Sequence, residues 1–172
     1  LDPVLEEAIY QSITAQVNSL GINLERCKSH LRSLDEESLR DTFFMALNSA
    51  YRGLVSTEAF NRSGKTDILI RYQDNNLYIS EFKIWRSYDY FSEGIDQLLN
   101  NLTWRDSKCS YVVFSKNNNF GNVLAKAQEL ISHHPQFVKI VKKVSENCIQ
   151  CRFKAKNTEK SVTLTLHIFD IH

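Results

Sequence analysis

Proline, glycine and long apolar runs are scarce in this sequence of 172 residues. Only two prolines and five glycines occur, which argues against flexible linkers and low-complexity segments. No run of about 18 apolar residues is present, so no segment is predicted to span a membrane, and no stretch resembles a signal peptide. A hydrophobic content of 42% and a charged content of 24% are ordinary for a soluble globular domain. We therefore expect a compact, cytoplasmic protein.

The net charge and the cysteines argue against a globally basic nucleic-acid-binding protein and against a zinc site. The formal net charge is only +1, so a face that binds a polyanion would have to be a local patch. Cys148 and Cys151 have the spacing of a metal-ligand or redox pair, but a zinc site needs a second pair and none is present. We expect reduced thiols, with a structural metal clip at these two cysteines as the weaker alternative. The chain begins with Leu1 rather than Met, so we also expect an additional domain in a longer protein.

The stretch from Ser63 to Trp85 organises the rest of the chain. Two β-branched and apolar runs flank an Asp/Asn-rich corner at residues 74–76, a pattern typical of a β-hairpin. Glu81 and Lys83 are two residues apart, so both lie on one face of their strand. Asp67 lies in the partner strand, where cross-strand neighbours come within about 5 Å. The hairpin is thus predicted to gather two carboxylates and a lysine.

Two carboxylates this close need a compensating charge. At about 4 Å and an effective dielectric constant near 20 they repel by roughly 4 kcal/mol, so they share a proton, bind a cation or pair with an ammonium group. Mg²⁺ typically takes one or two protein carboxylates and completes its shell with water and phosphate oxygens. Lys83 beside such a metal would orient or deprotonate a water, or neutralise a transition state. The pattern favours metal-dependent phosphodiester hydrolysis, and a surface ion pair between Glu81 and Lys83 is the alternative.

Periodicity places this hairpin in an α/β fold. A helix that begins at Asp2 and Pro3 and a weaker helix at 23–34 make a helical extension over residues 1–34, and residues 35–172 make the main domain. Ser33 and Glu36 are predicted to form a capping box that opens the next helix. The remaining predicted elements are that helix, which runs to Arg52, a strand at 54–60, the hairpin, a helix at 88–104, a strand at 109–115, a helix at 121–133 and strands at 137–144, 148–154 and 162–169.

The last of these strands alternates between apolar and polar residues. This pattern predicts a strand with one buried and one solvated face. His167 falls on the polar face, so we expect it to be solvated rather than catalytic.

The order helix, strand, strand, strand, helix, strand over residues 35–115 resembles the PD-(D/E)XK nuclease superfamily, which has the restriction-endonuclease-like fold. Asp67 matches the acidic strand residue of that family, and Glu81-x-Lys83 matches its (D/E)xK motif. Thr66 stands where many relatives have the proline that names the motif, and other relatives also lack it. The resemblance implies an αβββαβ core, with a central mixed β-sheet flanked by helices, extended here by N-terminal helices and C-terminal β-strands.

The resemblance also implies a metal site. Asp67, Glu81 and the Phe82 carbonyl would hold Mg²⁺ or Mn²⁺. Glu37 best matches a glutamate that is frequent in the first helix of the family, and it would act through a water or bind a second metal. Lys83 would activate the hydrolytic water.

Further residues are assigned by the same resemblance. Gln97 matches a glutamine common early in the second helix, and would position Lys83 or a phosphate. Glu58, in the strand before the hairpin, is either an additional ligand or an exposed strand carboxylate. The candidate phosphate contacts, any one of which is otherwise an ordinary surface charge, are Arg62, Lys65, Arg86 and Arg105.

The expected activity is that of a deoxyribonuclease, with DNA rather than RNA as its substrate. No base-reading module is visible in the sequence, so little sequence preference is expected. Many enzymes of this fold cut both strands as dimers, so a homodimer is compatible with the resemblance, as is the role of effector domain in a bacterial defence or repair protein. The alternative is a nucleic-acid-binding or assembly module that keeps the fold without cleaving.

Overall fold

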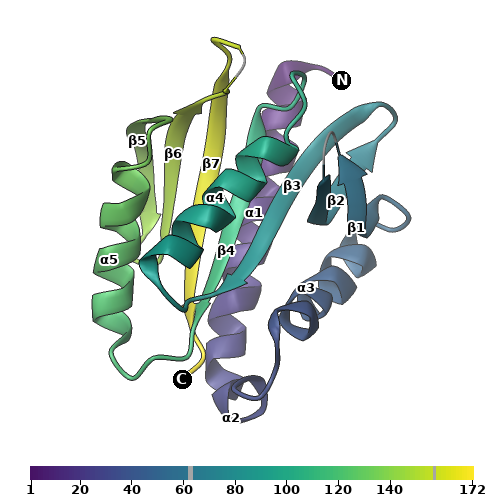
Figure 1. Ribbon diagram of the computed structural model, residues 1–172. Helices are drawn as coiled ribbons and strands as arrows, with labels where there is room; N and C mark the ends of the chain where they lie inside the picture. The colour runs from purple at the N-terminus through teal and green to yellow at the C-terminus, as the bar shows by residue number, and fades with distance from the viewer. Residues whose placement is uncertain (62–63, 157) are drawn as a thin grey trace.

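The computed structural model describes residues 1–61, 64–156 and 158–172. Within these residues one mixed sheet has the strand order β1-β2-β3-β4-β7-β6-β5 (Figure 1). β4 pairs in parallel with β3 and with β7, whereas β1–β2, β2–β3, β5–β6 and β6–β7 are antiparallel. The strands are β1 (Val55–Asn61), β2 (Gly64–Tyr72), β3 (Asn75–Ile84), β4 (Lys108–Ser115), β5 (Phe137–Ser145), β6 (Cys148–Lys154) and β7 (Ser161–Asp170).

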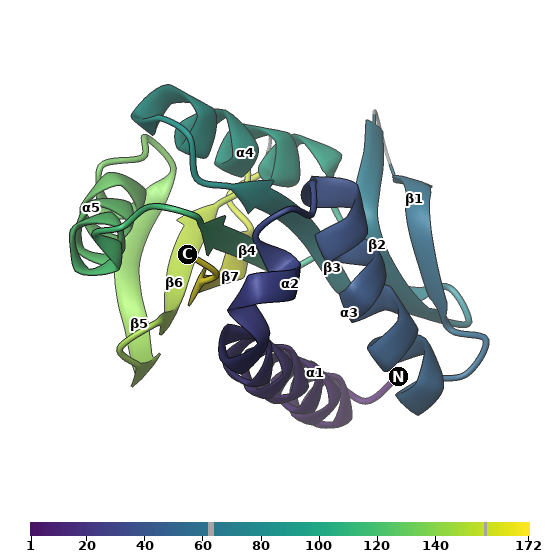
Figure 2. The ribbon, with the colours of Figure 1, turned by 90° about the horizontal axis from the view of Figure 1, so that it is seen from below.

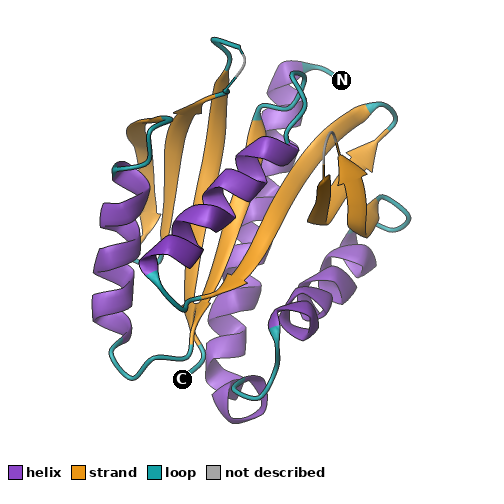
Figure 3. Ribbon diagram, in the orientation of Figure 1, coloured by secondary structure: helices purple, strands orange, loops and turns teal. Residues whose placement is uncertain are grey.

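Helices cover both faces of this sheet. The helices are α1 (Pro3–Leu24), a short 3₁₀ turn η1 (Glu25–Cys27), α2 (Lys28–Leu31), α3 (Glu36–Ala50), α4 (Tyr88–Asn101) and α5 (Phe120–Ser132). α4 and α5 lie on one face and α1 and α3 on the other (Figure 2). The α/β class is therefore confirmed, and the predicted order of helix, strand, strand, strand, helix and strand is present from α3 to β4 (Figure 3). No described helix combines the length and apolar character needed to cross a membrane.

Side-chain caps set where the helices begin. Asp2 accepts hydrogen bonds from the backbone N–H groups of the first turn of α1, and Pro3 occupies a position where a missing N–H costs nothing. The predicted capping box of Ser33 and Glu36 is wrong: Asp35 caps α3 by accepting from the N–H of Ser38. Because the Asp35 carboxylate caps the first turn of α3, Glu36 does not serve as part of the cap and is available for other contacts.

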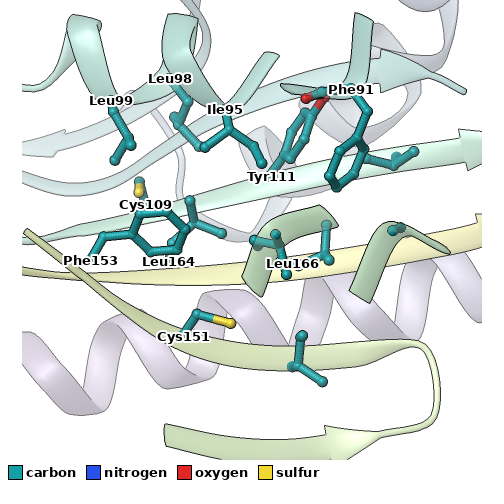
Figure 4. Packing of buried hydrophobic residues seen from close by; sticks show 14 of the residues in the cluster. Phe91, Ile95, Leu98, Leu99, Cys109, Tyr111, Cys151, Phe153, Leu164 and Leu166 are labelled. Carbon is teal, nitrogen blue, oxygen red and sulfur yellow. Dashed lines mark hydrogen bonds between the residues drawn. The ribbon is translucent and has the colours of Figure 1, made fainter. Parts of the chain in front are cut away.

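The face under α4 and α5 is closed by apolar side chains of these two helices and of the strands β2, β3, β4, β6 and β7. Phe91, Ile95, Leu98 and Leu99 point from α4 onto the sheet (Figure 4). Tyr111 of β4 is fully buried beneath them and donates a hydrogen bond to the Phe91 carbonyl at 2.9 Å. A Cβ atom at position 94 would collide with the Tyr111 hydroxyl, so a glycine is required there. α4 is thereby fixed over β3 and β4.

The opposite face is closed by α1 and α3. α1 lies against β7, where the Tyr10 hydroxyl donates to the Cys109 carbonyl at 2.6 Å and contacts the Thr165 hydroxyl at 2.7 Å. Phe43 of α3 packs edge-on against Phe82 of β3, with ring centroids 5.2 Å apart. The helical segment before α3 therefore contributes buried residues to the same core as the strands.

The expectation of a solvated His167 is wrong. β7 lies between β4 and β6 and is covered on both faces, so Thr165 and His167 are buried along with its apolar residues. His167 is 0% exposed, and burial lowers its pKa to about 3. Its Nδ1 atom lies 3.5 Å from the Cys148 sulfur, and its Nε2 atom has no hydrogen-bond partner among the described residues.

All four cysteines are free. Cys148 faces His167, whereas Cys151 belongs to the cluster under α5, so the two side chains lie on opposite faces of β6. Burial raises the pKa of each of these two thiols to about 12. A metal clip formed by this pair alone does not fit such an arrangement, because both sulfurs would have to face one ion.

Candidate active site

β2 and β3 separate before either strand ends. Their pairing runs from Tyr72 and Asn75 to Ile68 and Ser80, although β2 begins at Gly64 and β3 continues to Ile84. On its other edge β3 remains paired with β4 up to Ile84. The two strands diverge from their shared turn, and the first turn of α3 lies near the gap (Figure 2). We call residues 64–67 and 81–84 the fork.

Two carboxylates replace the missing strand partner at the fork. Oδ2 of Asp67 accepts the N–H of Phe82 at 2.7 Å, and Oε2 of Glu36 accepts the N–H of Ile84 at 2.7 Å. A buried backbone N–H needs an acceptor, so these contacts fix both carboxylates at the edge of β3. The N–H and the C=O of a strand residue face the same edge, so the Phe82 carbonyl also faces the fork.

Glu81 and Lys83 form an ion pair beside these carboxylates. The Lys83 Nζ atom lies 2.9 Å from Oε1 of Glu81. Glu81 is only 1% exposed, and its Oε2 atom has no hydrogen-bond partner among the described residues. Burial, followed by the nearby Asp67 carboxylate, raises the pKa of Glu81 to about 7. Burial opposes the charge of Lys83, but Glu81 outweighs it and the pKa of Lys83 is raised.

Asp67 is the second partly buried carboxylate of the site. Burial raises its pKa, while the Phe82 N–H, Lys83 and Arg40 oppose that shift. The buried Arg40 guanidinium lies 3.8 Å from Oδ1 of Asp67 and 3.5 Å from Oε1 of Glu58. Arg40 therefore places a permanent positive charge between carboxylates of β1 and β2.

Glu58 has a strained backbone next to this arginine. Its φ angle is +48°, in the left-handed region that a residue with a Cβ atom rarely adopts. It follows Thr57 and precedes Ala59, which pair with Ile68 and Thr66, so Glu58 lies opposite Asp67. Such strain costs roughly 1–3 kcal/mol and is concentrated at functional sites. Glu58 also lies 3.9 Å from Nζ of Lys65.

The carboxylate that α3 brings to the fork belongs to Glu36. Glu37 is exposed, whereas Glu36 accepts from Ile84 and from the Tyr90 hydroxyl, at 2.8 Å to Oε1. Gln97 is exposed on α4. Gln97 comes seven residues after Tyr90 and four before Asn101, so these three residues lie on the same side of α4.

The basic residues divide between two ends of the molecule. Lys65 is in the fork, where its carbonyl accepts from the Asn101 side chain at 2.9 Å. The Arg86 guanidinium lies 4.6 Å from the centre of the Tyr90 ring and 3.9 Å from Oε2 of Glu36. Arg105 lies in the loop before β4, and Arg62 lies outside the described residues.

Sequence reasoning did not assign Glu36, Arg40 or Tyr90 to the site. For Tyr90 no signal existed, because its role depends on how α4 lies across the end of β3. Arg40 had one weak signal, since it stands four residues after Glu36 and so shares its side of the helix.

Asp67, Glu81 and the Phe82 carbonyl offer oxygen atoms of the kind that a hard divalent cation prefers. No group of three or more His, Cys, Asp or Glu side chains within residues 1–61, 64–156 and 158–172 is placed to hold a metal. Two carboxylates and a carbonyl are nevertheless the usual protein share of a Mg²⁺ site, and the unpartnered Oε2 of Glu81 offers one such oxygen. Comparisons of the chain with family models, curated proteins and solved structures found no match.

Proposed function

We propose that this protein is a Mg²⁺- or Mn²⁺-dependent nuclease that hydrolyses phosphodiester bonds of DNA, with a restriction-endonuclease-like core. The observation that carries the proposal is the buried Oε2 atom of Glu81, which lacks a hydrogen-bond partner among the described residues. A buried carboxylate oxygen left unpaired destabilises the fold. A divalent cation would satisfy Glu81 and Asp67 together, because both offer the oxygen ligands that such ions prefer.

Asp67, Glu81 and the Phe82 carbonyl would hold the metal, and the fork supports each of them differently. The Phe82 N–H fixes Asp67 through Oδ2. Lys83 fixes Glu81 through Oε1, which leaves Oε2 free for a ligand. When bound, the ion lowers the pKa of a water and stabilises negative charge on a phosphate.

Lys83 acts in this proposal as a charged hydrogen-bond donor. Its raised pKa keeps it an ammonium group at neutral pH. An ammonium group beside the ligands would hold the attacking water or a phosphate oxygen through its N–H groups and offset the charge of the transition state.

Glu36, rather than Glu37, is the α3 carboxylate of the proposed site. The Ile84 N–H and the Tyr90 hydroxyl hold it in place. Arg86 and Lys65, whose side chains are 59% and 54% exposed, border the same site. Both are long cations in contact with solvent, which suits contacts to a DNA backbone.

A nucleic-acid-binding module without catalysis is the second candidate. Its support is the pairing of Glu81 with Lys83 and of Asp67 with Arg40, which offsets much of the carboxylate charge with no cation present. This candidate predicts DNA binding that is indifferent to divalent metal.

The test is a cleavage assay on supercoiled plasmid and on single-stranded DNA with Mn²⁺, Mg²⁺ or EDTA. The variants are Lys83→Ala and Asp67→Asn, with Lys154→Ala as a control for loss of a surface lysine, since Lys154 is 63% exposed and lies in β6. Glu36→Gln and Glu37→Gln form a matched pair that separates the two α3 glutamates.

We expect metal-dependent cutting that Lys83→Ala, Asp67→Asn and Glu36→Gln remove and that Lys154→Ala retains. Cutting that survives Lys83→Ala and Asp67→Asn would overturn the site. DNA binding without cutting, together with no metal binding by calorimetry, would establish the second candidate instead.

A further inference from the structure

A pocket of about 520 Å³ lies at the end of β3 opposite Lys83 and Ile84. Its lining includes Arg71, Leu77, Leu99, Leu102, Trp104 and Arg105. The β2–β3 turn, the end of α4 and the start of β4 come together there, at the upper end of the sheet in Figure 1. At a rise of about 3.3 Å per residue, β3 carries Leu77 of this end pocket roughly 13 Å from Glu81 and roughly 20 Å from Lys83.

The end pocket combines an apolar floor with an exposed indole. Leu77, Leu99 and Leu102 are 4%, 6% and 4% exposed, so they present a packed apolar surface. Trp104 is 66% exposed, and the Arg105 guanidinium lies 4.3 Å from its ring centre. Arg105 covers only part of the indole, so ring surface remains for a flat ligand.

Hydrogen bonds hold the Trp104 loop in place. The carboxylate of the buried Asp106 accepts from the Thr103 N–H at 2.6 Å and from the Asn76 side chain at 2.9 Å. Lys160 donates to the carbonyls of Trp104 and Arg105 at 3.1 and 2.6 Å. The loop is therefore ordered before any ligand arrives, which lowers the entropic cost of binding.

Two arginines of the end pocket have no carboxylate partner among the described residues. Arg71 donates to the Asn76 side chain, and Arg105 stacks on Trp104. The lysines differ: Lys108 lies 3.7 Å from Glu6, and Lys156 lies 3.6 Å from an aspartate of α4. Guanidinium groups that no described carboxylate neutralises, beside an aromatic ring, match an anion attached to a flat ring system.

We propose that the end pocket binds a nucleotide unit, with the base against Trp104 and the leucine floor and the phosphate between Arg71 and Arg105. Its volume lies in the range of about 300–1,000 Å³ typical of small-ligand pockets, and base stacking on aromatic side chains contributes to single-strand binding in many proteins. The unit is a nucleoside phosphate, either free or at the end of a strand. The inference goes beyond the proposed nuclease site and does not depend on its metal.

The test is a titration followed by tryptophan fluorescence, with EDTA present and in the Lys83→Ala background. The probes are AMP, dTMP and a 5′-phosphorylated oligothymidylate, with adenosine and inorganic phosphate as incomplete ligands. The variants are Arg71→Gln, Arg105→Gln and Trp104→Phe at the end pocket, and Arg86→Gln at the fork. Asp74→Asn removes the carboxylate at the β2–β3 turn, which also lines the pocket.

We expect saturable quenching by AMP or dTMP, at least tenfold weaker binding of adenosine and of phosphate, and loss of the signal in Trp104→Phe. With AMP and dTMP as the probes, Arg71→Gln and Arg105→Gln should each weaken binding at least fivefold, Arg86→Gln should leave it unchanged, and Asp74→Asn should tighten it two- to fivefold. Tighter binding of the oligothymidylate than of dTMP would identify a strand end as the source, and the reverse a free nucleotide.

The inference would be overturned by no saturable quenching by any nucleotide, or by AMP and dTMP binding that Arg86→Gln weakens and Arg105→Gln does not. Adenosine binding as tightly as AMP would also overturn it, because the arginines would then contribute nothing. Each of these results leaves the nuclease proposal to its own metal-dependent assay.

Discussion

Glu81 and His167 are both buried, and each has one polar atom without a hydrogen-bond partner among the described residues. Their surroundings differ. Charged groups surround Glu81, and its pKa responds to Asp67, Lys83 and Glu36 as well as to burial. The pKa of His167 is shifted by burial alone, and its ring stacks on Phe169.

The backbone around the two residues explains this difference. β7 is paired on both edges at His167, with Val112 on one side and Cys148 on the other. β3 has lost its β2 partner where Glu81 lies. The unpaired atom of His167 thus lies in an unbroken ladder, whereas that of Glu81 lies among charges at a break in the ladder, where we propose that a cation binds.

Substitutions of Glu81 and His167 should differ most in their effect on DNA cleavage. Glu81→Gln should lower the rate of metal-dependent DNA cleavage by roughly 10³-fold, or about 4 kcal/mol, because the amide lacks the charge that holds a cation. His167→Leu should leave the rate within about threefold, since His167 touches no group of the proposed site. Initial rates on plasmid DNA in Mn²⁺ measure both. Equal losses of cleavage rate in the two variants would contradict a special role of Glu81.

The two residues also predict opposite dependences of stability on pH. Folded His167 has a pKa of about 3, against about 6.5 when unfolded. The unfolded state thus binds more protons between these values, and stability falls as the pH falls. Replacing His167 by Leu should remove about 2–3 kcal/mol of the stability lost between pH 7.5 and pH 4.5. Urea unfolding at the two pH values tests this, and an unchanged pH dependence would contradict it.

For Glu81 the sign is reversed. The folded carboxyl holds its proton up to about pH 7, whereas the unfolded one loses it near 4.3. The folded state binds more protons in between, so this group favours folding at low pH, and that contribution is lost as the pH rises to 7. In metal-free buffer, Glu81→Gln should gain about 2 kcal/mol relative to the wild type between pH 5 and pH 8. A relative loss over that range would contradict a buried, protonated Glu81.

A smaller effect is expected from the group that positions Glu36. Tyr90→Phe removes the hydroxyl that donates to Glu36 at 2.8 Å, and should lower the cleavage rate by about three- to tenfold, as the loss of one charge-assisted hydrogen bond would. Tyr88→Phe is the matched control, because Tyr88 is half exposed on the same helical turn. Comparable losses in both variants would assign the effect to α4 rather than to Glu36.

Local patterns predicted the fold class and the order of elements, because hydrophobic period and turn residues act over a few positions. These patterns gave the wrong prediction for His167. The alternation of apolar and polar residues in β7 indicates two unlike faces, but it cannot reveal that α1 covers the second face. Asp67, Glu81 and Lys83 could be placed together from hairpin spacing alone. The choice between Glu36 and Glu37 could not be made, because it depends on the helix cap at Asp35 and on the open edge of β3.

The contact between α1 and β7 has a consequence for biosynthesis. Tyr10 leaves the ribosome before Thr165, whose hydroxyl it contacts and which is made 155 residues later. Until β7 is made, the apolar stripe of α1 therefore lacks one of the strands on which it packs, and β4 and β6 cannot be joined, because β7 lies between them in the sheet. A chain of this design acquires its native core late, and chaperones that shield amphipathic helices would act on it before release.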